Sequence, residues 1–296
     1  MGNARVNDHK SVARPFVSIL ASLTFLGMSA TGGVAADCGD SAGPGGSRVA
    51  CDCGDTLVTS AVLKKRDPVT RGQCPGNGLT IATHTQGITL DCRGRKITGS
   101  GAGVGIYIES ASGATIRRCK IEGFKPAILG WNLYQLTLDR SVLQRNQGYA
   151  LDCEECAEVR VSGSRIDHNG SGIIADQADN FEIERNTIAR NEGDGVWLIE
   201  AWGNRIERNK ITNNEGTGVL LMFDPGENVV ARNVVDRNGG DGVMIEPLGT
   251  NNLVAGNKAR RNKGVGICVP PENIDGGQNK ASKNGETDIS FTGCPG

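Results

Sequence analysis

A repeat of 23 or 24 residues between Phe181 and Val269 constrains this chain more than any other feature of its sequence. The shared frame is N-x-(I/V/A)-x-x-N-x-G-x-G-(V/I)-x-(I/L/V), and its first asparagine stands at Asn186, Asn209, Asn233 and Asn257. A second asparagine follows five positions later in every unit. Self-similarity at a fixed period of this size is typical of stacked-repeat architectures, in which each unit contacts only its neighbours.

The hydrophobic pattern within each unit predicts short β-strands. Apolar residues alternate over short stretches that are rich in β-branched side chains, as at Ile206, Ile211 and Val219. No unit holds an apolar stretch long enough for a helical repeat. Asp-Gly pairs are typical of hairpins, but a hairpin meander does not explain the long period. The units therefore predict parallel sheets in which successive coils lie about 4.8 Å apart.

The asparagines that recur in every unit have a structural explanation. Turns between strands need residues that tolerate positive φ, which Asn and Gly supply. Stacked side-chain amides can also hydrogen-bond from one coil to the next. We therefore expect Asn209 to lie against Asn186 and Asn233 in the neighbouring coils.

These features resemble the right-handed parallel β-helix superfamily, which includes pectate lyases, mannuronan epimerases and periplasmic copper-protein accessory β-helices. The coil length, short strands and asparagine ladders carry the resemblance, which covers residues 79–291. It implies an all-β fold with a single right-handed parallel β-helix, and equivalent ladder positions give about nine coils. Because one fold hosts many functions, the resemblance implies little about chemistry. Inward-facing residues of the outlying coils are expected to include Leu90, Cys92, Ile97, Ile106, Ile108, Ile116, Ile121, Leu138, Leu143, Val161, Ile166, Val254 and Ala259.

The N-terminal segment has the features of an export signal. A basic start, an apolar stretch from Phe16 to Met28 and the small residues at positions 34–36 match a signal peptide with its cleavage site. The apolar run is too short to span a bilayer. We expect a secreted or periplasmic protein with a signal peptide at 1–36, a disulfide-rich N-terminal cap segment at 37–78, and a β-helix with a C-terminal cap at 79–296.

All ten cysteines follow residue 36, and an even number in an exported chain favours disulfides. The sequence around Cys53 and Cys74 resembles the N-terminal module of bacterial β-helix proteins, and this resemblance implies that the two are paired. Disulfides at both ends of a stack would also cover exposed sheet edges. The expected pairs are Cys53–Cys74, Cys38–Cys51 and Cys268–Cys294.

Composition and motifs argue against several partners. The formal net charge is −1, whereas nucleic-acid-binding domains are strongly basic, so no nucleic acid is expected. No stretch after the signal segment is apolar enough to span a membrane. Neither a metal nor a cofactor is expected. Met244 interrupts the calcium-type nonapeptide that begins at Gly239, and Cys153 and Cys156 lack a second Cys or His pair for zinc, which favours a local disulfide.

Two basic columns are expected on the outside, one just before the first asparagine position of the repeat and one just before the second. The simpler interpretation is a solvated surface with salt bridges to acidic neighbours, and the alternative is a track that binds a polyanion. The first column is Arg118, Arg140, Arg185, Arg208 and Arg232, with Arg165 nearby. The second is Arg145, His168, Arg190, Asn213, Arg237, Arg261 and Lys283.

An acidic column and an apolar column are expected side by side on another outer face. An exposed apolar stripe marks a ligand groove, a partner, or coverage by another segment or a second copy. Aromatic rings beside carboxylates suit sugars, because the rings take C–H-rich surfaces and the carboxylates take hydroxyls. The acidic column is Glu109, Asp152, Asp176, Glu200, Asp224 and Glu246, and the apolar column is Tyr107, Ile174, Trp197, Leu220 and Met244. The candidate substrate-binding residues are Asp194, Trp197, Glu200, Trp202, Phe223, Asp224 and Glu246.

A candidate catalytic group follows from what the resemblance implies. Lyases and epimerases of the superfamily abstract a proton beside a carboxylate, and the epimerase group carries an Asp-Pro-His-Asp signature. The similar string that starts at Asp224 has glycine in place of the histidine. Asp167 and His168 therefore form the candidate base, with Arg145 and Arg190 neutralising a uronate.

The expected function is the binding or processing of a polysaccharide, neutral or anionic, along the outer face of the stack. One alternative is a uronate polysaccharide lyase or C5-epimerase. The other is a non-catalytic surface or assembly protein that self-associates through the apolar stripe.

Overall fold

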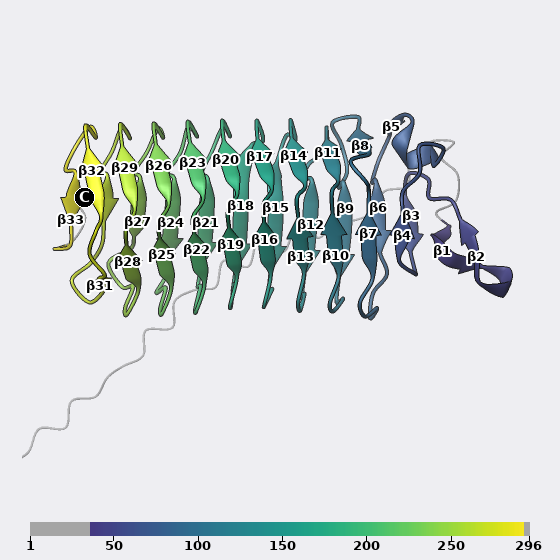
Figure 1. Cartoon of the computed structure of the whole chain (residues 1–296), viewed down its shortest axis with the longest axis horizontal. Coiled ribbons are helices and arrows are strands. Elements are labelled where there is room, and N and C mark those ends of the chain that lie inside the picture. Colours follow the sequence, from purple (N-terminus) through teal and green to yellow (C-terminus); the bar gives the residue numbers. More distant parts are fainter. Residues whose placement is uncertain (1–35, 293–296) are drawn as a thin grey trace, which may run out of the picture. The chain divides into compact units, whose positions relative to one another are not determined.

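A computed structural model describes residues 36–292, so nearly all of the expected signal peptide lies outside the described residues. Within them, short strands wind into coils that stack along one axis (Figure 1). The coils build one sheet of 13 strands and two sheets of 10, named sheets 1, 2 and 3 here in their order along a coil. All pairs between coils are parallel, which confirms the β-helix expected from the repeat.

Sheet 1 begins at an antiparallel hairpin, β1–β2, and continues as parallel strands. Its strands are β1 (Asp37–Gly43), β2 (Ser47–Val49), β3 (Asp55–Leu57), β6 (Leu79–Ile81), β9 (Ile106–Glu109), β12 (Ile128–Trp131), β15 (Tyr149–Glu154), β18 (Ser171–Asp176), β21 (Val196–Ile199), β24 (Val219–Met222), β27 (Val243–Ile245), β30 (Ile267–Cys268) and β33 (Ile289–Ser290).

Sheets 2 and 3 form the other two sides of the coil. Sheet 2 comprises β4 (Ala61–Val62), β7 (Thr89–Asp91), β10 (Thr115–Arg117), β13 (Thr137–Asp139), β16 (Arg160–Ser162), β19 (Glu182–Glu184), β22 (Arg205–Glu207), β25 (Val229–Ala231), β28 (Leu253–Ala255) and β31 (Ile274–Asp275). Sheet 3 comprises β5 (Gln73–Cys74), β8 (Lys96–Gly99), β11 (Lys120–Glu122), β14 (Val142–Gln144), β17 (Arg165–Asp167), β20 (Thr187–Ala189), β23 (Lys210–Thr212), β26 (Val234–Asp236), β29 (Lys258–Arg260) and β32 (Lys280–Ser282).

Two short 3₁₀ helices, η1 (Pro44–Gly46) and η2 (Pro68–Thr70), lie near the N-terminal end. Sheet 1 holds eleven strands from β3 to β33, so the stack has about eleven coils rather than nine. The expected count followed positions equivalent to the ladder asparagines, from Arg95 to Asn279. It missed the coil of β3, β4 and β5, which precedes Arg95, and the incomplete coil that begins at β33, which follows Asn279.

The core is a set of aliphatic rows that run along the inside of the stack. Ile183, Ile206 and Val230 form one such row in sheet 2, and all three are fully buried. The inward residues expected from the alternation are buried as well. Because each buried Ile, Leu or Val contributes roughly 1.5–3 kcal/mol, these rows are the main source of stability.

Three buried asparagine ladders close the corners of the stack. Asn209 Nδ2 donates to the Oδ1 atom of Asn233 at 3.1 Å, and Asn209 Oδ1 accepts from the backbone N–H of Asn186 at 2.9 Å. The expected contact between these coils is confirmed. Two ladders follow the repeat frame, and the third precedes sheet 2 at Asn204, Asn228, Asn252 and Asn273.

The left-handed positions of the turns differ from the expectation. Positive φ is found at the residue before the ladder asparagine, as at Arg185 (55°), Arg190 (56°) and Arg208 (56°), and not at Asn186, Asn191 or Asn209. The ladder asparagine must point inward for its amide to reach the next coil. The preceding residue points outward, so it takes the left-handed conformation.

Both ladders of the repeat frame end in a carboxylate. In the last coil, Asn284 Nδ2 donates to Asp288 at 2.8 Å, and Asn279 Nδ2 donates to Asp275 at 3.0 Å. Each aspartate accepts the hydrogen bond that a further asparagine would have accepted. The ladders are therefore satisfied at their C-terminal ends.

Four disulfides lie within the described residues. Cys38–Cys51 and Cys53–Cys74 link the N-terminal segment as expected, and Cys153–Cys156 is the expected local pair. Cys92–Cys119, which joins two neighbouring coils, was not anticipated, since Cys92 was expected only as a core residue. The expected Cys268–Cys294 pair includes Cys294, which lies outside the described residues.

Candidate functional site

The residues of the apolar column expected on the outer face of sheet 1 are paired in register between neighbouring strands. Ile174, Trp197, Leu220 and Met244 pair in successive strands, and Tyr107 belongs to the same column three strands before Ile174. Trp197 is half-buried, and no described residue accepts a hydrogen bond from its buried Nε1. The column is therefore a partly exposed apolar stripe along the stack.

The expected acidic column is not continuous. Asp152 pairs with Leu129 and Ile174 and so interrupts the apolar column. Glu109 and Asp176 lie two residues further along their strands, in a column that also holds Trp131. In addition, Glu200 and Asp224 lie in turns with positive φ rather than on the strand face. The alignment failed because coil lengths vary. Asp152 lies two positions too early, and Glu154 occupies the register position shared with Glu109 and Asp176.

Asp152 is unusual among the carboxylates of sheet 1. Burial in the apolar column, together with the nearby charge of Glu154, raises the pKa of Asp152 to about 6. Burial also raises the pKa of Asp194, although Asp194 accepts a hydrogen bond from the backbone N–H of Thr217 at 2.6 Å. Asp152 in the stripe and Asp194, just before β21, are therefore both easier to protonate than usual.

The aromatic candidates of the following turns are exposed. Trp202 and Phe223 are 43% and 54% exposed. The ring of Trp202 lies over Gly226, where an added Cβ would approach it to 2.3 Å. Glu246 accepts a hydrogen bond from the backbone N–H of Phe223 at 2.9 Å. Gly226 stands where the epimerase signature has histidine, and here it makes room for an aromatic ring.

The candidate catalytic residues gather around Asp167, at the end of β17 in sheet 3. Its Oδ2 atom is 2.8 Å from Nδ1 of His168, 2.8 Å from Nη2 of Arg165 and 3.4 Å from Nη2 of Arg190. Burial opposes ionisation of Asp167, but the hydrogen bonds from Arg165 and His168 outweigh it and lower its pKa. Asp167 therefore orients His168 as an anionic partner would orient a general base.

Arg145 is not part of this hydrogen-bonded group. Its backbone N–H donates to the carbonyl of Asp167 at 3.3 Å, but its side chain forms no ion pair with the carboxylate. Its charge instead acts on Glu122, where it helps to lower the pKa. Arg165 takes the place next to Asp167 that Arg145 was expected to share.

A recess that the sequence did not suggest runs along the outer face of sheet 2. Three cavities of about 420, 300 and 280 Å³ follow one another there. The first two share Arg160 and Glu182, and the last two share Arg205 and Glu207. They form one trough, which spans six coil steps, or about 29 Å, from β13 to β31.

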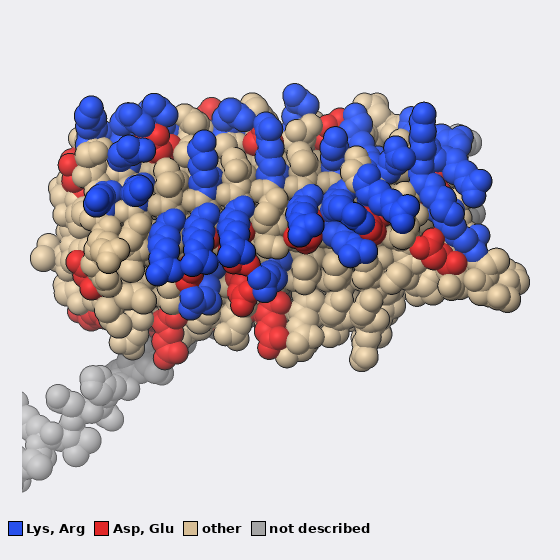
Figure 2. Space-filling view, viewed as in Figure 1, with Lys and Arg blue, Asp and Glu red and all other residues tan. Residues whose placement is uncertain are grey.

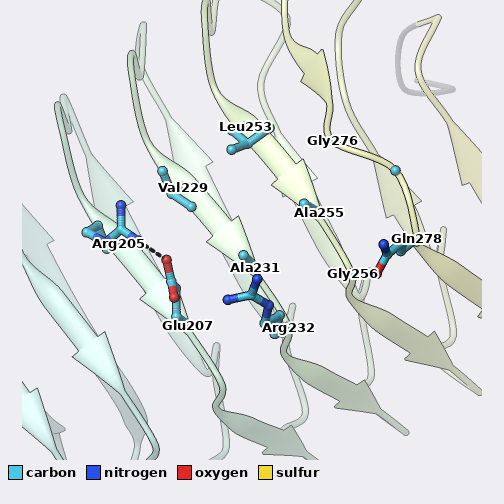
Figure 3. A pocket seen from close by; sticks show the side chains of 11 residues that line it. Arg205, Glu207, Val229, Ala231, Arg232, Leu253, Ala255, Gly256, Gly276 and Gln278 are labelled. Carbon is cyan, nitrogen blue, oxygen red and sulfur yellow. Dashed lines mark hydrogen bonds and ion pairs between the residues drawn. The ribbon is translucent and has the colours of Figure 1, made fainter.

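The lining of the trough changes along its length. Towards the N-terminal end it is charged, with Arg160 paired to Glu182 at 3.0 Å and also to Glu184, and with Arg205 paired to Glu207. Towards the C-terminal end its floor is apolar, and Figure 3 shows this part between Arg205 and Gln278. The apolar floor residues are Val229, Ala231, Leu253 and Ala255.

The sequence contained a usable signal for this trough. The outward residues of sheet 2 flank each inward Ile or Val, as in Arg205-Ile206-Glu207. The charged residues in this pattern predict only surface salt bridges, and the recess depends on how the outward positions of successive coils align. Among residues 36–292, no group of three or more His, Cys, Asp or Glu side chains is placed to hold a metal ion. In the same part of the chain, the structure contains no helix with the length and apolar character to cross a membrane.

Fold and surface together define a parallel β-helix with an elongated trough on one side. The chain belongs to the family described as the right handed beta helix region, whose model matches residues 73–171 and 149–294. No curated protein sequence matches it significantly.

Solved structures with the same fold share little sequence with it. The periplasmic alginate epimerase AlgG is 16% identical with a TM-score of 0.58, over 80% of this chain and 64% of that one. The mannuronan C-5 epimerase AlgE4 A-module of Azotobacter vinelandii is 14% identical with a TM-score of 0.51, over 87% and 84%. The Dettilon tailspike protein gp208 is 15% identical with a TM-score of 0.54, over 79% and 59%. At these identities the likeness shows the fold alone.

Proposed function

We propose that this protein is exported and binds a polysaccharide in the trough on sheet 2. The observation that carries the proposal is a continuous recess, parallel to the stack, with charged groups at one end and an apolar floor at the other. The Arg–Glu pairs offer donors and acceptors for hydroxyl groups, and Leu253 and Val229 offer surface for the C–H faces of sugar rings. A recess of several coils suits a polymer better than a small ligand.

Two further observations support this proposal. The similar structures carry names of proteins that act on alginate or mannuronan, which are polysaccharides. The four disulfides fit an oxidising compartment, in agreement with the expected signal peptide. A secreted or periplasmic location follows from the proposal.

A glycan array with neutral and uronate polymers tests the proposal. Arg205→Ala is expected to weaken binding of a retained polymer at least about ten-fold, because a hydrogen bond to a charged group is worth roughly 1.5–3 kcal/mol. Lys210→Ala, in the same coil but on sheet 3, is the matched control and should leave the affinity unchanged. Retention of no polymer, or equal losses in the two variants, would contradict the proposal.

The geometry around Asp167 favours a second candidate function, a uronate lyase or C5-epimerase. The hydrogen bond from His168 Nδ1 to Asp167 fixes the imidazole ring and turns its Nε2 atom away from the carboxylate. That nitrogen would remove the proton beside a uronate carboxylate, whose charge Arg165 and Arg190 would neutralise.

Turnover of uronate polymers tests this second candidate. His168→Ala should lower the formation of unsaturated ends, or the epimer exchange, by at least about 100-fold, which is the usual contribution of a general base. His84→Ala is the control, because His84 is exposed and distant in the chain from Asp167. Full turnover in His168→Ala would remove this assignment and leave the binding proposal intact.

A further inference from the structure

Sheet 3 carries a column of outward residues that contains basic side chains and no acidic ones. Successive strands place Lys96, Lys120, Val142, Arg165, Thr187, Lys210, Val234, Lys258 and Lys280 in register. Lys120, Lys210 and Lys258 are exposed and form no ion pair with the described residues. Neighbouring members of the column are about 4.8 Å apart along the stack.

Two more basic columns border this one. The turn from sheet 2 to sheet 3 carries Arg118, Arg140, Arg185, Arg208 and Arg232, and the turn from sheet 3 to sheet 1 carries Arg145, His168, Arg190, Arg237, Arg261 and Lys283. Figure 2 shows Lys and Arg side chains over the strands of sheet 3 and in a row below them. The three columns together make the basic face, a name used below for sheet 3 and these two turns.

The carboxylates of sheet 3 lie beneath this layer of cations. Glu122, Asp167 and Asp236 are the acidic residues of its other outward column, and their side chains are at most 16% exposed. The basic side chains paired with them, such as Arg190 and Arg261, are 40% exposed or more. Over sheet 3 itself, solvent therefore meets mainly cations. In the turn from sheet 3 to sheet 1, the exposed Glu192 and Glu215 lie two residues beyond the basic column, towards sheet 1. The two columns furthest from sheet 1 carry the uniform positive charge.

We propose that the basic face docks on an anionic lipid surface whose headgroups carry phosphate. Guanidinium groups bind phosphate oxygens in pairs, and each Lys or Arg near such a surface adds to the attraction. The face is three columns wide and nine strands long, so it presents cations in two dimensions. A single polymer chain would contact only one or two columns, whereas a headgroup layer contacts all three.

The polysaccharide trough remains free in this arrangement. Its floor lies on sheet 2, and sheet 3 forms a different side of the coil. Arg208 and Arg232 stand at the border, where they line the trough and also belong to the basic face. Binding to a lipid surface would place the trough beside that surface with its lining exposed. The inference does not depend on what the trough binds.

Vesicle co-sedimentation of the whole protein tests the inference. Wild-type protein should sediment with phosphatidylglycerol vesicles and not with phosphatidylcholine vesicles, and raising the salt concentration should release it. Lys210→Gln/Lys258→Gln should weaken binding about thirty-fold, because each Lys near an anionic surface contributes about 1 kcal/mol. Gln177→Glu/Leu248→Glu makes the same change in net charge on exposed residues of the turn between sheets 1 and 2, opposite the basic face, and should bind like wild type.

Three results would overturn the inference. The first is equal binding to both kinds of vesicle, or to neither. The second is an equal loss in the two double variants, which would indicate an effect of net charge alone. The third is a soluble uronate polymer that binds in a Lys210-dependent and Lys258-dependent way while vesicles do not, which would assign the basic face to a polysaccharide.

Discussion

Asn209→Ala is expected to lower the free energy of unfolding by about 3–5 kcal/mol. The Nδ2 atom of Asn209 donates to the carbonyl of Ile183 at 2.7 Å and to Asn233, and its Oδ1 atom accepts from the backbone and side chain of Asn186. Alanine would leave the N–H of Asn186 and the carbonyl of Ile183 buried without partners. Each unsatisfied buried group costs roughly 1–3 kcal/mol.

Asn213→Ala, four residues away, is the matched control. Asn213 is exposed, and its left-handed backbone makes alanine cost only about 1 kcal/mol. Urea unfolding followed by circular dichroism measures both variants. Equal losses would mean that the buried ladder has no special role in stability.

Asp152→Asn is expected to stabilise the protein by about 2 kcal/mol at pH 7.5 and by almost nothing near pH 4. Burial raises the pKa of Asp152 to about 6 in the folded protein, whereas an unfolded aspartate has a pKa of about 3.9. The folded protein therefore binds the proton more tightly than the unfolded chain. The contribution of Asp152 is most favourable below pH 4, and it is lost as the pH rises through 6.

Unfolding free energies at the two pH values measure this difference. Asp179→Asn is the control, because Asp179 is exposed on the turn between sheets 1 and 2. Its effect on the free energy of unfolding should be small. Asp152→Asn would contradict the prediction if its stability at pH 7.5 equalled or fell below that of the wild type.

The fold could be predicted from the sequence because one spacing fixes it. Residues 24 positions apart, such as Asn209 and Asn233, lie in contact, and the alternation around Ile206 then sets inside and outside. The first coil could not be counted in the same way. It precedes Arg95, the first position that aligns with the repeat, so only pairing in space reveals that Asp55–Leu57 lies against Leu79–Ile81.

The surface was harder to predict than the core. Inward positions accept only apolar or ladder side chains, which makes them recognisable in the sequence. Outward positions accept almost any residue, so their register had to be inferred from coils of unequal length. This is why the apolar stripe with Trp197 was aligned correctly, whereas Asp152 was placed in the wrong column.

The trough illustrates a second limit of sequence reasoning. Arg160, Glu182 and Arg205 belong to successive coils and look like ordinary surface ion pairs. A recess depends on the sizes of side chains that meet across coils, and on the bulk of the turns beside them. Those quantities appear only when the coils are stacked. The trough and the basic face can therefore be recognised only in the three-dimensional structure.

The aspartates at the C-terminal end of the asparagine ladders limit how a second copy could stack there. A carboxylate accepts hydrogen bonds but donates none, so Asp275 and Asp288 leave the two ladders no amide with which to recruit another copy. Fibre growth from this end would have to proceed without the polar zipper that joins the coils inside one chain.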